Sequence, residues 1–376
     1  MNTNLAIPLP PGDEITIRPA RESDRDSVIR IVSEIFREDA SERYEWLYLG
    51  NPHGRALSWL AFDGNSRDPV AITSMFPRRV LVDGRIRRGA IGGDCYVMPA
   101  ARRRGLATRL HEASFRDMRS LGVEFMYGPP WPKNLKALVK AGSTEVATYR
   151  RYARPLTHKA VSAGMQSALP HGMRGGFSGR VVAGLSLMPH WLLECLRKNH
   201  AKRCAIEPVT SFGDEWSEFL DRAMRSYPVC CVRDPEYLNW RYIQGASEAR
   251  TPYGIHHGGK LVGLVVLEKY GRQMIVVDML SVANSADTSL TLRLAMHKAI
   301  EEGCESISFE TIPTAPLARR LFRLGFLARE GRGFQVACDG QEQECSFLHD
   351  PEHWHFALGD QDPRHSYYEV GNQPGA

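Results

Sequence analysis

Apolar residues recur along the first part of the chain at the two spacings that distinguish strands from helices. Ile15-Thr16-Ile17 alternates as a short strand does, and residues 26–36 are apolar at helical spacing after Ser23 or Asp24, either of which can cap a helix. Further strands are predicted at residues 58–62, 70–75, 79–82 and 85–88, with the turn Asp83-Gly84 between the last two.

A strand that ends at Val97 leads into a basic turn, and the turn opens a helix predicted over residues 106–121. Four residues share the apolar face of this helix, with Asp117 as an exception within it: Leu106, Leu110, Ala113 and Leu121. The pattern then predicts a strand at 123–127, a proline-rich break at 128–132, a short helix from Asn134 and a closing strand at 148–155.

The basic turn has the chemistry of a phosphate site. Gly105 and Ala107 lack bulk, so a ligand can approach the backbone closely. The first amides of a helix have no partner within the helix, and the helix dipole favours an anion there. Arg102, Arg103 and Arg104 add positive charge. A solvated basic turn is the alternative, and the pattern around it favours a pyrophosphate site.

The second half repeats the pattern of the first. The segment Glu236–Tyr242 parallels Glu42–Tyr48, so that Trp240 matches Trp46 and Tyr242 matches Tyr48. We interpret these aromatic residues as a repeated core position. Strands follow at 259–267, 274–282 and 306–310, with a helix at 289–300. The repeat predicts two domains of one architecture.

The stretch between the halves differs in character. Residues 172–179 are glycine-rich and basic, and residues 181–196 are strongly apolar. We interpret the apolar part as a helical linker that packs between domains. The alternative is an interfacial patch with four lipid-facing cations: Arg174, Arg180, Arg197 and Lys198.

Composition sets wide bounds on function. The chain of 376 residues, 43% of them hydrophobic, is long enough for two cored domains. A net charge of +5 does not indicate nucleic acid binding. The eight cysteines form no C-x-x-C pair and predict the reduced thiols of an intracellular protein. No secretion signal and no apolar stretch of about 20 residues is present, so we expect a cytoplasmic protein without stable membrane insertion.

A histidine-rich C-terminal region is the only candidate for a metal site. Its residues lack a recognised ligand spacing, so we expect no metal. They are His349, His353, His355 and His365, with Cys345, Asp360 and Asp362. The sequence leaves the oligomeric state open.

The spacing Val97-x-Pro99-x-x-Arg102-x-x-Gly105-x-Ala107-x-x-Leu110 resembles the coenzyme A loop of the GNAT superfamily of acyltransferases, an R/Q-x-x-G-x-G/A turn after a strand. The resemblance implies an α+β fold (an α/β mixed sheet) of two tandem GNAT-like domains, each a mixed, mostly antiparallel sheet flanked by helices. The expected parts are an N-terminal tail at 1–14, a first domain at 15–155, a helical linker at 156–204, and a second, degenerate domain with a C-terminal extension at 205–376.

The resemblance also implies acetyl-CoA as the cofactor, held by backbone amides of the loop and lying between two splayed strands that end here at Val97 and Tyr127. The residues expected to contact it are Cys95, Val97, Arg102, Arg103, Arg104, Gly105, Leu106, Ala107 and Asn134. In the second half the matching stretch Ser281–Thr288 has no arginine or glycine and contains Asp287, with no cation nearby in the sequence. Because Asp287 would repel a phosphate, only the first domain is expected to hold coenzyme A.

Asp94 matches the acidic residue that often serves as general base in the family, and a structural carboxylate bonded to loop amides is the alternative role. The tyrosine that often protonates the leaving thiolate is missing from the short region 134–142, and nothing selects among Tyr96, Tyr127, Tyr149 and Tyr152. We interpret Cys95 as a core residue rather than a nucleophile, because no histidine is near it in the sequence.

The sequence therefore predicts an N-acyltransferase, in the first place an N-acetyltransferase, in which the amine attacks the thioester directly. The tandem layout is similar to that of bacterial acetyltransferases associated with exopolysaccharide and surface sugars, which implies an amino sugar or nucleotide amino sugar as acceptor. A natural-product amine or antibiotic comes second and a protein amine third. Two alternatives are a non-catalytic coenzyme A or sugar sensor and a Fem-like peptidyl transferase, against which the pyrophosphate loop argues.

Overall fold

The computed structural model describes residues 15–64, 66–157, 160, 203–245, 250–283, 285–338 and 342–361. The chain divides into two compact units. The first comprises Met1–Arg78, Arg88–Glu145 and Gln335–Gln341, and the second Arg79–Arg87, Val146–Phe334 and Glu342–Ala376. The apolar stretch 181–196, interpreted above as a linker, lies outside the described residues. The expected domain boundaries stay a prediction.

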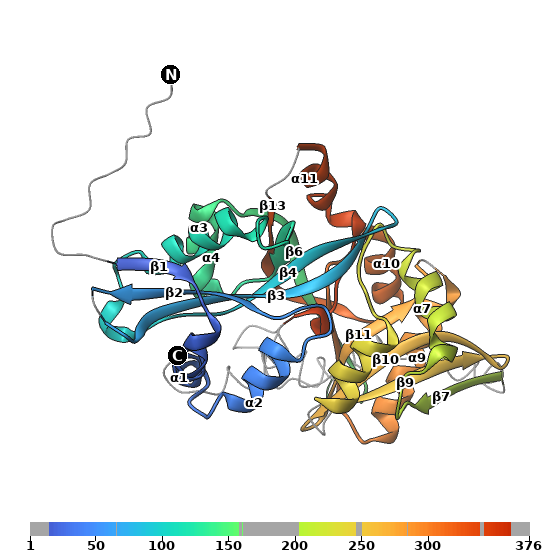
Figure 1. Cartoon of the computed structure of the whole chain (residues 1–376). Helices are drawn as coiled ribbons and strands as arrows, with labels where there is room; N and C mark the ends of the chain where they lie inside the picture. Colours follow the sequence, from blue (N-terminus) through green and yellow to red (C-terminus); the bar gives the residue numbers. More distant parts are fainter. Residues whose placement is uncertain are drawn as a thin grey trace, which may run out of the picture. The chain divides into compact units, whose positions relative to one another are not determined.

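The first unit is built on a sheet with strand order β1-β2-β3-β4-β5, and the end of β13 lies beside β5. Its strands are β1 (Ile15–Pro19), β2 (Leu57–Asp63), β3 (Pro69–Val82), β4 (Arg85–Val97) and β5 (Phe125–Gly128), with Gln335–Cys338 of β13 (Leu327–Cys338). Its helices are η1 (Glu22–Asp24), α1 (Arg25–Phe36), α2 (Ser41–Arg43), the π-helical turn η2 (Tyr44–Leu49), η3 (Pro99–Ala101), α3 (Leu106–Met118) and α4 (Pro132–Ala141). Figure 1 shows α3 and α4 on one side of β1–β3, and α1 and α2 on the other.

Helix α3 packs on this sheet by the face predicted from its sequence. Leu106, Leu110 and Ala113 are buried. Asp117 interrupts the apolar face because its Oδ2 accepts a hydrogen bond from the indole nitrogen of the fully buried Trp59, at 3.0 Å. Leu121 is exposed, contrary to the prediction, because α3 ends at Met118.

Two further expectations are corrected in the first unit. The strands predicted at 70–75 and 79–82 form one strand, β3. Pro77 lies between them, and proline fixes φ at a value that an extended strand tolerates. Asp24 precedes α1 as predicted, but its side chain does not cap the helix. Its carboxylate instead accepts hydrogen bonds from Arg18, at 2.6 and 2.9 Å.

The second unit has the strand order β7-β9-β10-β11-β12-β6. Its strands are β6 (Thr144–Pro155), which begins in the first unit, β7 (Cys204–Pro208), β9 (Arg250–His257), β10 (Lys260–Tyr270), β11 (Gln273–Ser281) and β12 (Ser306–Thr311), with the short β8 (Val229–Cys231) and β14 (Trp354–His355). Its helices are η6 (Asp214–Trp216), α7 (Ser217–Met224), α8 (Pro235–Asn239), the π-helical turn η7 (Trp240–Gln244), α9 (Ala286–Glu301), α10 (Ala315–Arg323), α11 (Glu342–Leu348), η8 (Pro351–His353) and η9 (Leu358–Asp360).

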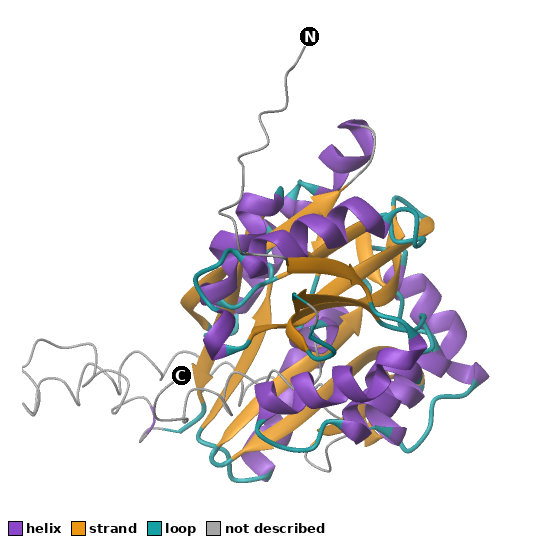
Figure 2. Cartoon of the chain, turned by 60° about the vertical axis from the view of Figure 1, so that its left-hand side comes forward, coloured by secondary structure: helices purple, strands orange, loops and turns teal. Residues whose placement is uncertain are grey.

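The two strand orders correspond position by position. In each unit the fourth and fifth strands of the order, β4 with β5 and β11 with β12, are parallel neighbours. The other pairings of the first unit's β1–β2–β3 and of the second unit's six strands are antiparallel. Figure 2 shows helices beside the strands. The predicted fold class, a mixed and mostly antiparallel sheet flanked by helices, is confirmed.

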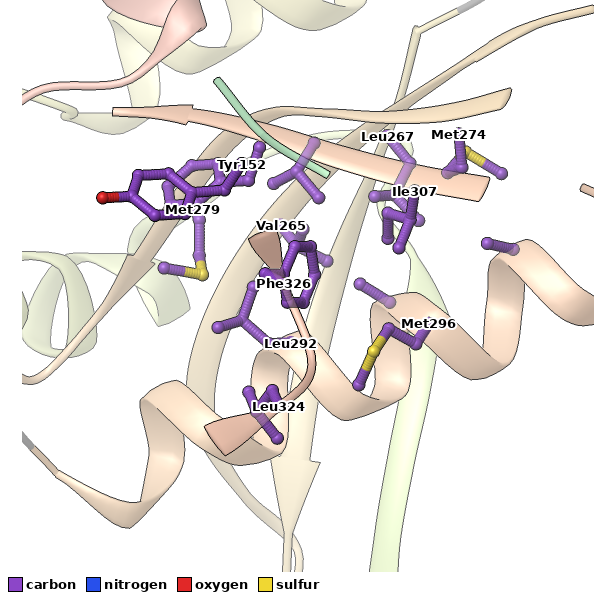
Figure 3. Packing of buried hydrophobic residues seen from close by; sticks show 14 of the residues in the cluster. Tyr152, Val265, Leu267, Met274, Met279, Leu292, Met296, Ile307, Leu324 and Phe326 are labelled. Carbon is purple, nitrogen blue, oxygen red and sulfur yellow. The ribbon is translucent and has the colours of Figure 1, made fainter. Parts of the chain in front are cut away.

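Each unit has its own hydrophobic core. In the second unit α9 and α10 cover one core cluster, in which Leu292 and Met296 of α9 lie against Val265 and Ile307 of the sheet (Figure 3). In the first unit the cluster joins α3 to β2, β3 and β5 and includes the fully buried Trp59. In both units, apolar side chains of the helices and strands therefore bury apolar surface, which is the main favourable term in folding.

The expectation that all cysteines are reduced is wrong at two positions. Cys338 and Cys345 are disulfide-bonded, and a C-x6-C spacing carries no redox or metal signature from which this could be predicted. Five others in the described part of the chain are free: Cys95, Cys204, Cys230, Cys231 and Cys304. Within the described ranges no helix combines the length and apolarity needed to cross a bilayer. The same ranges contain no group of three or more acidic, cysteine or histidine side chains able to hold a metal ion.

Gly128 ends β5 with φ at 136°, and a Cβ there would lie 2.6 Å from Ile91 Cδ1 of β4. We therefore expect Gly128→Ala to lower the free energy of unfolding more than Gly142→Ala, whose φ is 111° but whose Cβ would meet no atom within 4 Å. The steric part should amount to about 1–3 kcal/mol. Urea unfolding of the two variants and of Gly128→Ala with Ile91→Val measures it. Equal losses in both single variants, or no recovery in the double variant, would contradict the steric account.

Candidate active site

The pairing of the two parallel strands of the first unit ends at the point where the sequence predicts a ligand. β4 pairs with β5 from Gly89–Phe125 to Ile91–Tyr127, and β4 then continues to Val97 while β5 ends at Gly128. Gly128 and its φ of 136° allow the close approach to Ile91 just before the strands part. The stretch of β4 beyond Ile91 thus continues without pairing to β5, and the expected splaying of the two strands stays a prediction.

Asp94 lies on this stretch and is buried, with 3% of its surface exposed. Its Oδ1 accepts a hydrogen bond from Arg43 Nη2 at 2.8 Å, and its Oδ2 accepts from Arg43 Nε at 3.1 Å and from the Tyr48 hydroxyl at 2.6 Å. Burial, and next the Asp94 charge, raise the pKa of Tyr48 well above its usual value, so its hydroxyl keeps its proton. Asp94 has the left-handed φ of 46°. The general-base role expected for it stays a prediction.

Cys95 lies next to a histidine that the sequence did not bring to attention. Its sulfur is 3.6 Å from His111 Nε2 of α3 and 3.6 Å from Asn134 Oδ1 of α4, and His111 Nε2 is 3.0 Å from the same Asn134 oxygen. Burial raises the pKa of the Cys95 thiol to about 12 and lowers the pKa of His111 to about 4. The proton therefore stays on sulfur and the imidazole is neutral, which does not favour a nucleophilic thiolate.

The predicted phosphate turn follows β4 and opens α3. Gly105 is the residue before the helix, with φ at 71°, and no side chain caps the helix start. A Cβ at Gly105 would meet no atom within 4 Å, so the space next to the turn is open. The amides of Leu106, Ala107 and Thr108 are the first of α3 and have no partner within the helix. The turn thus fits an anion, and a pyrophosphate in particular.

The three arginines of the turn have different surroundings. Arg102 Nε donates to the Val97 carbonyl at 3.1 Å, and its guanidinium lies 5.9 Å from the ring centre of Tyr96. Arg104 pairs with Asp63 at 2.5 Å, and this hydrogen bond lowers the pKa of the Asp63 carboxyl. Arg103 is exposed and has a left-handed φ of 67°. Arg102 and Arg103 are thus both exposed to solvent, whereas Arg104 is partly buried.

The start of α9 in the second unit is the counterpart of this turn. Ser285 precedes the helix, and Asp287 lies in its first turn. No cation is nearby in the sequence, but the fold brings Arg320 of α10 there. Its guanidinium donates to the Ser285 carbonyl and, at 3.1 Å, to Ser289 Oγ. The charge argument against an anion in the second unit is therefore weaker than it appeared from the sequence.

The structure groups the site residues predicted from the sequence in one region of the first unit, along the end of β4, the turn and the starts of α3 and α4. Three residues near them were missed, namely Arg43, Tyr48 and His111. Tyr48 carried a signal, because it recurs as Tyr242 in the repeated segment. Arg43 and His111 carried none, since only the fold brings them to Asp94 and Cys95. Of the tyrosines considered as proton donors, Tyr127 is fully buried, while Tyr149 and Tyr152 belong to the second unit.

Comparison with known proteins agrees with this geometry. Residues 16–153 match the family model described as an acetyltransferase (GNAT) domain. Solved structures of similar fold include a probable N-acyltransferase from Enterococcus faecalis (13% identity, 86% of this chain and 72% of that chain, TM-score 0.56) and a GCN5-related N-acetyltransferase from Anabaena variabilis (11%, 86% and 72%, TM-score 0.58). Another is Saccharomyces cerevisiae N-myristoyltransferase with bound myristoyl-CoA (14%, 89% and 81%, TM-score 0.54). No curated protein matches the sequence.

The raised pKa of Cys95, about 12, predicts slow alkylation. At pH 8 the thiolate fraction should be about 10³-fold below that of an ordinary cysteine. Iodoacetamide labelling of the folded protein, followed by mass spectrometry of the peptide that contains residue 95, measures the rate, with urea-unfolded protein as reference. Labelling at the unfolded rate would mean that the thiol is ionised and would reopen the nucleophile interpretation.

The lowered pKa of His111, about 4, predicts a loss of stability in acid. The unfolded chain binds a proton near pH 6.5 and the folded site does not, so the free energy of unfolding falls as pH drops from about 6.5 to 4, by about 3 kcal/mol for this group. His111→Gln should remove this share of the pH dependence, whereas replacing the exposed His297 by glutamine should leave it unchanged. Urea unfolding between pH 4 and 8 tests this, and equal slopes in the wild type and His111→Gln would contradict it.

Proposed function

We propose that the protein is a coenzyme A-dependent N-acyltransferase acting on the primary amine of a small molecule or amino sugar, because residues 16–153 match the family model of an acetyltransferase (GNAT) domain. The observation that carries the proposal is the open turn Arg102–Ala107, with its free helix amides directly after β4. The domain match makes an acyltransferase the enzyme class. The cofactor, acyl group and acceptor are the proposed parts.

The residues of the first unit divide the binding of an acyl-coenzyme A between them. The amides of Leu106 and Ala107, with Arg103 nearby, suit the pyrophosphate. The backbone of Cys95 to Val97, beyond the β4–β5 separation, suits the pantetheine arm and the thioester carbonyl. Asn134 lies at the start of α4, where its Oδ1 is held by His111. Bound there, acyl-coenzyme A would supply the activated carbonyl.

The proposed reaction is direct transfer. The amine nitrogen forms a bond to the thioester carbonyl carbon, and the carbon–sulfur bond breaks. The proton that the nitrogen loses balances the proton that the coenzyme A thiolate gains, so the products are an amide and free coenzyme A. A neutral His111 and a protonated Cys95 do not supply a covalent relay, which supports a single-step transfer over an acyl-enzyme.

For the acceptor we keep the order given by the resemblance: an amino sugar or nucleotide amino sugar first, then a natural-product amine or antibiotic, then a protein amine. Acetyl is the proposed acyl group. One structural neighbour was solved with myristoyl-CoA, so chain length is a variable to be measured. A non-catalytic coenzyme A sensor and a Fem-like transferase remain as defined outcomes of the experiment.

The experiment that tests the proposal is thiol release from acetyl-, butyryl- and myristoyl-CoA by the full chain, across amino sugars, nucleotide amino sugars, aminoglycosides and peptides. Turnover that requires one acceptor class would support the enzyme and identify its substrate. Coenzyme A binding in calorimetry without turnover for any acceptor would favour the sensor. The absence of coenzyme A binding would refute the proposal. It is the result expected of a Fem-like transferase, whose donor is an aminoacyl-tRNA.

Charge reversal at the turn gives a sharper prediction. Arg102→Glu with Arg104→Glu should weaken coenzyme A binding by at least about tenfold, because each reversal replaces attraction by repulsion of the phosphates. The matched control is Arg222→Glu with Arg225→Glu on α7, which changes the net charge equally on exposed residues of the second unit. Calorimetry at 0.15 M salt compares them. Equal affinities in the two double variants would remove the turn from the binding site.

A further inference from the structure

A cluster of three side chains to which the proposed function assigns no role occurs in both units. In the first unit Arg43 and Asp94 form an ion pair whose side chains are completely buried, and Tyr48 donates its hydroxyl to the same carboxylate. Tyr48 comes from the π-helical turn η2, and Asp94 from β4, the fourth strand of the sheet order.

The second unit contains a similar arrangement, in which the arginine also pairs with a second buried carboxylate, that of Asp360, at 2.6 Å. Arg233 donates from Nη2 to Asp278 Oδ1 at 2.9 Å and from Nε to Oδ2 at 3.1 Å, and both side chains are buried. Tyr242 donates its hydroxyl to Asp278 Oδ2 at 2.9 Å. Tyr242 also comes from a π-helical turn, η7, and Asp278 also lies on the fourth strand of its order, β11. The carboxylate, its arginine fork and its tyrosine therefore recur as a set.

The recurrence separates the cluster from coenzyme A chemistry. The first unit follows Asp94 with the basic glycine turn, whereas the second follows Asp278 with Ser285 and Asp287 at the helix start. A carboxylate that is needed only for catalysis has no reason to keep the same arginine and tyrosine where the turn is absent. A general base must also take up a proton in each cycle, and protonating Asp94 would leave the buried guanidinium of Arg43 without its counter-charge.

The two aspartates of the clusters differ in backbone conformation. Asp94 has a φ of 46°, in the left-handed region that a non-glycine residue seldom adopts, and Asp278 does not. The kink lies between Ile91, where β4 last pairs with β5, and Val97, where the turn begins. Such a conformation persists only when the surrounding structure stabilises it. Arg43 and Tyr48 both donate hydrogen bonds to this carboxylate.

We propose that Asp94 is a positioning residue: Arg43 and Tyr48 hold it in the kinked conformation, and the kink aims the backbone of Cys95–Val97 at the thioester. The inference rests on the proposed function of the first unit. Its consequence for the reaction is that the proton of the amine passes to water and not to Asp94. Tyr48 is excluded as the proton donor to the thiolate as well, because its buried hydroxyl is committed to the carboxylate and burial raises its pKa.

The test compares Tyr48→Phe with its counterpart Tyr242→Phe in the full chain. Each variant removes one hydroxyl from one buried cluster, so both should lower the melting temperature by similar amounts. Only Tyr48→Phe should also lower kcat, by about tenfold, because a small misplacement of the reacting groups slows the reaction. KM for acetyl-CoA should change less than kcat. An equal kcat in the two variants would show that the cluster serves stability alone and would overturn the inference.

The pH profile of Asp94→Asn decides between positioning and general-base roles. We expect kcat/KM to fall at every pH while the acidic limb keeps the midpoint of the wild type. Loss of that limb would identify Asp94 as the base and overturn the inference. If Asp94→Asn does not fold, Tyr48→Phe provides the same comparison, since a base deprived of one donor would move the midpoint of the limb.

A wild type that turns over no acceptor would refute the proposed function together with the inference, whereas an active wild type with an equally active Tyr48→Phe refutes the inference alone.

Discussion

A buried ion pair between an arginine and an aspartate, closed by a tyrosine hydroxyl, is the constraint on which each sheet depends. In the first unit it joins Arg43 to Asp94, and in the second Arg233 to Asp278. Breaking such a pair by removing one partner costs about 3–5 kcal/mol, a large share of the 5–15 kcal/mol that is typical for a folded domain. The pair ties the turn that carries the tyrosine to the fourth strand, and the position of that strand sets where the next helix begins.

Among the residues that the structure describes, the first unit alone adds the elements of the proposed coenzyme A site to this shared frame. Gly128 lets β5 approach Ile91 and then end, so β4 continues without it. Gly105 leaves open space before α3. At the corresponding helix start the second unit has Ser285 and the guanidinium of Arg320. The two units share a strand order but differ at this helix start. This difference supports the proposal that the first unit binds the cofactor and that the second has another role.

The fold was largely predictable because the local spacing of apolar residues predicts most of its helices and strands. The alternation of Ile15-Thr16-Ile17 in β1 and the helical spacing of α3 follow from which faces are buried, and the basic glycine turn follows from backbone chemistry. The contacts of Asp94 and Cys95 were not predictable, since Arg43 and His111 are distant from them in the sequence and only the packed sheet brings them together. Arg320 shows the same limit, because a charge argument confined to neighbouring residues omitted a cation from another helix.

The central claim is that the first unit, and not the second, binds coenzyme A at the turn after β4. Hydrogen–deuterium exchange of the full chain with and without coenzyme A tests it most directly, because the free amides at the start of α3 exchange readily until a phosphate occupies them. The account predicts slower exchange over residues 95–108 on addition of coenzyme A and no change over residues 281–291. Protection confined to the start of α9 would contradict it.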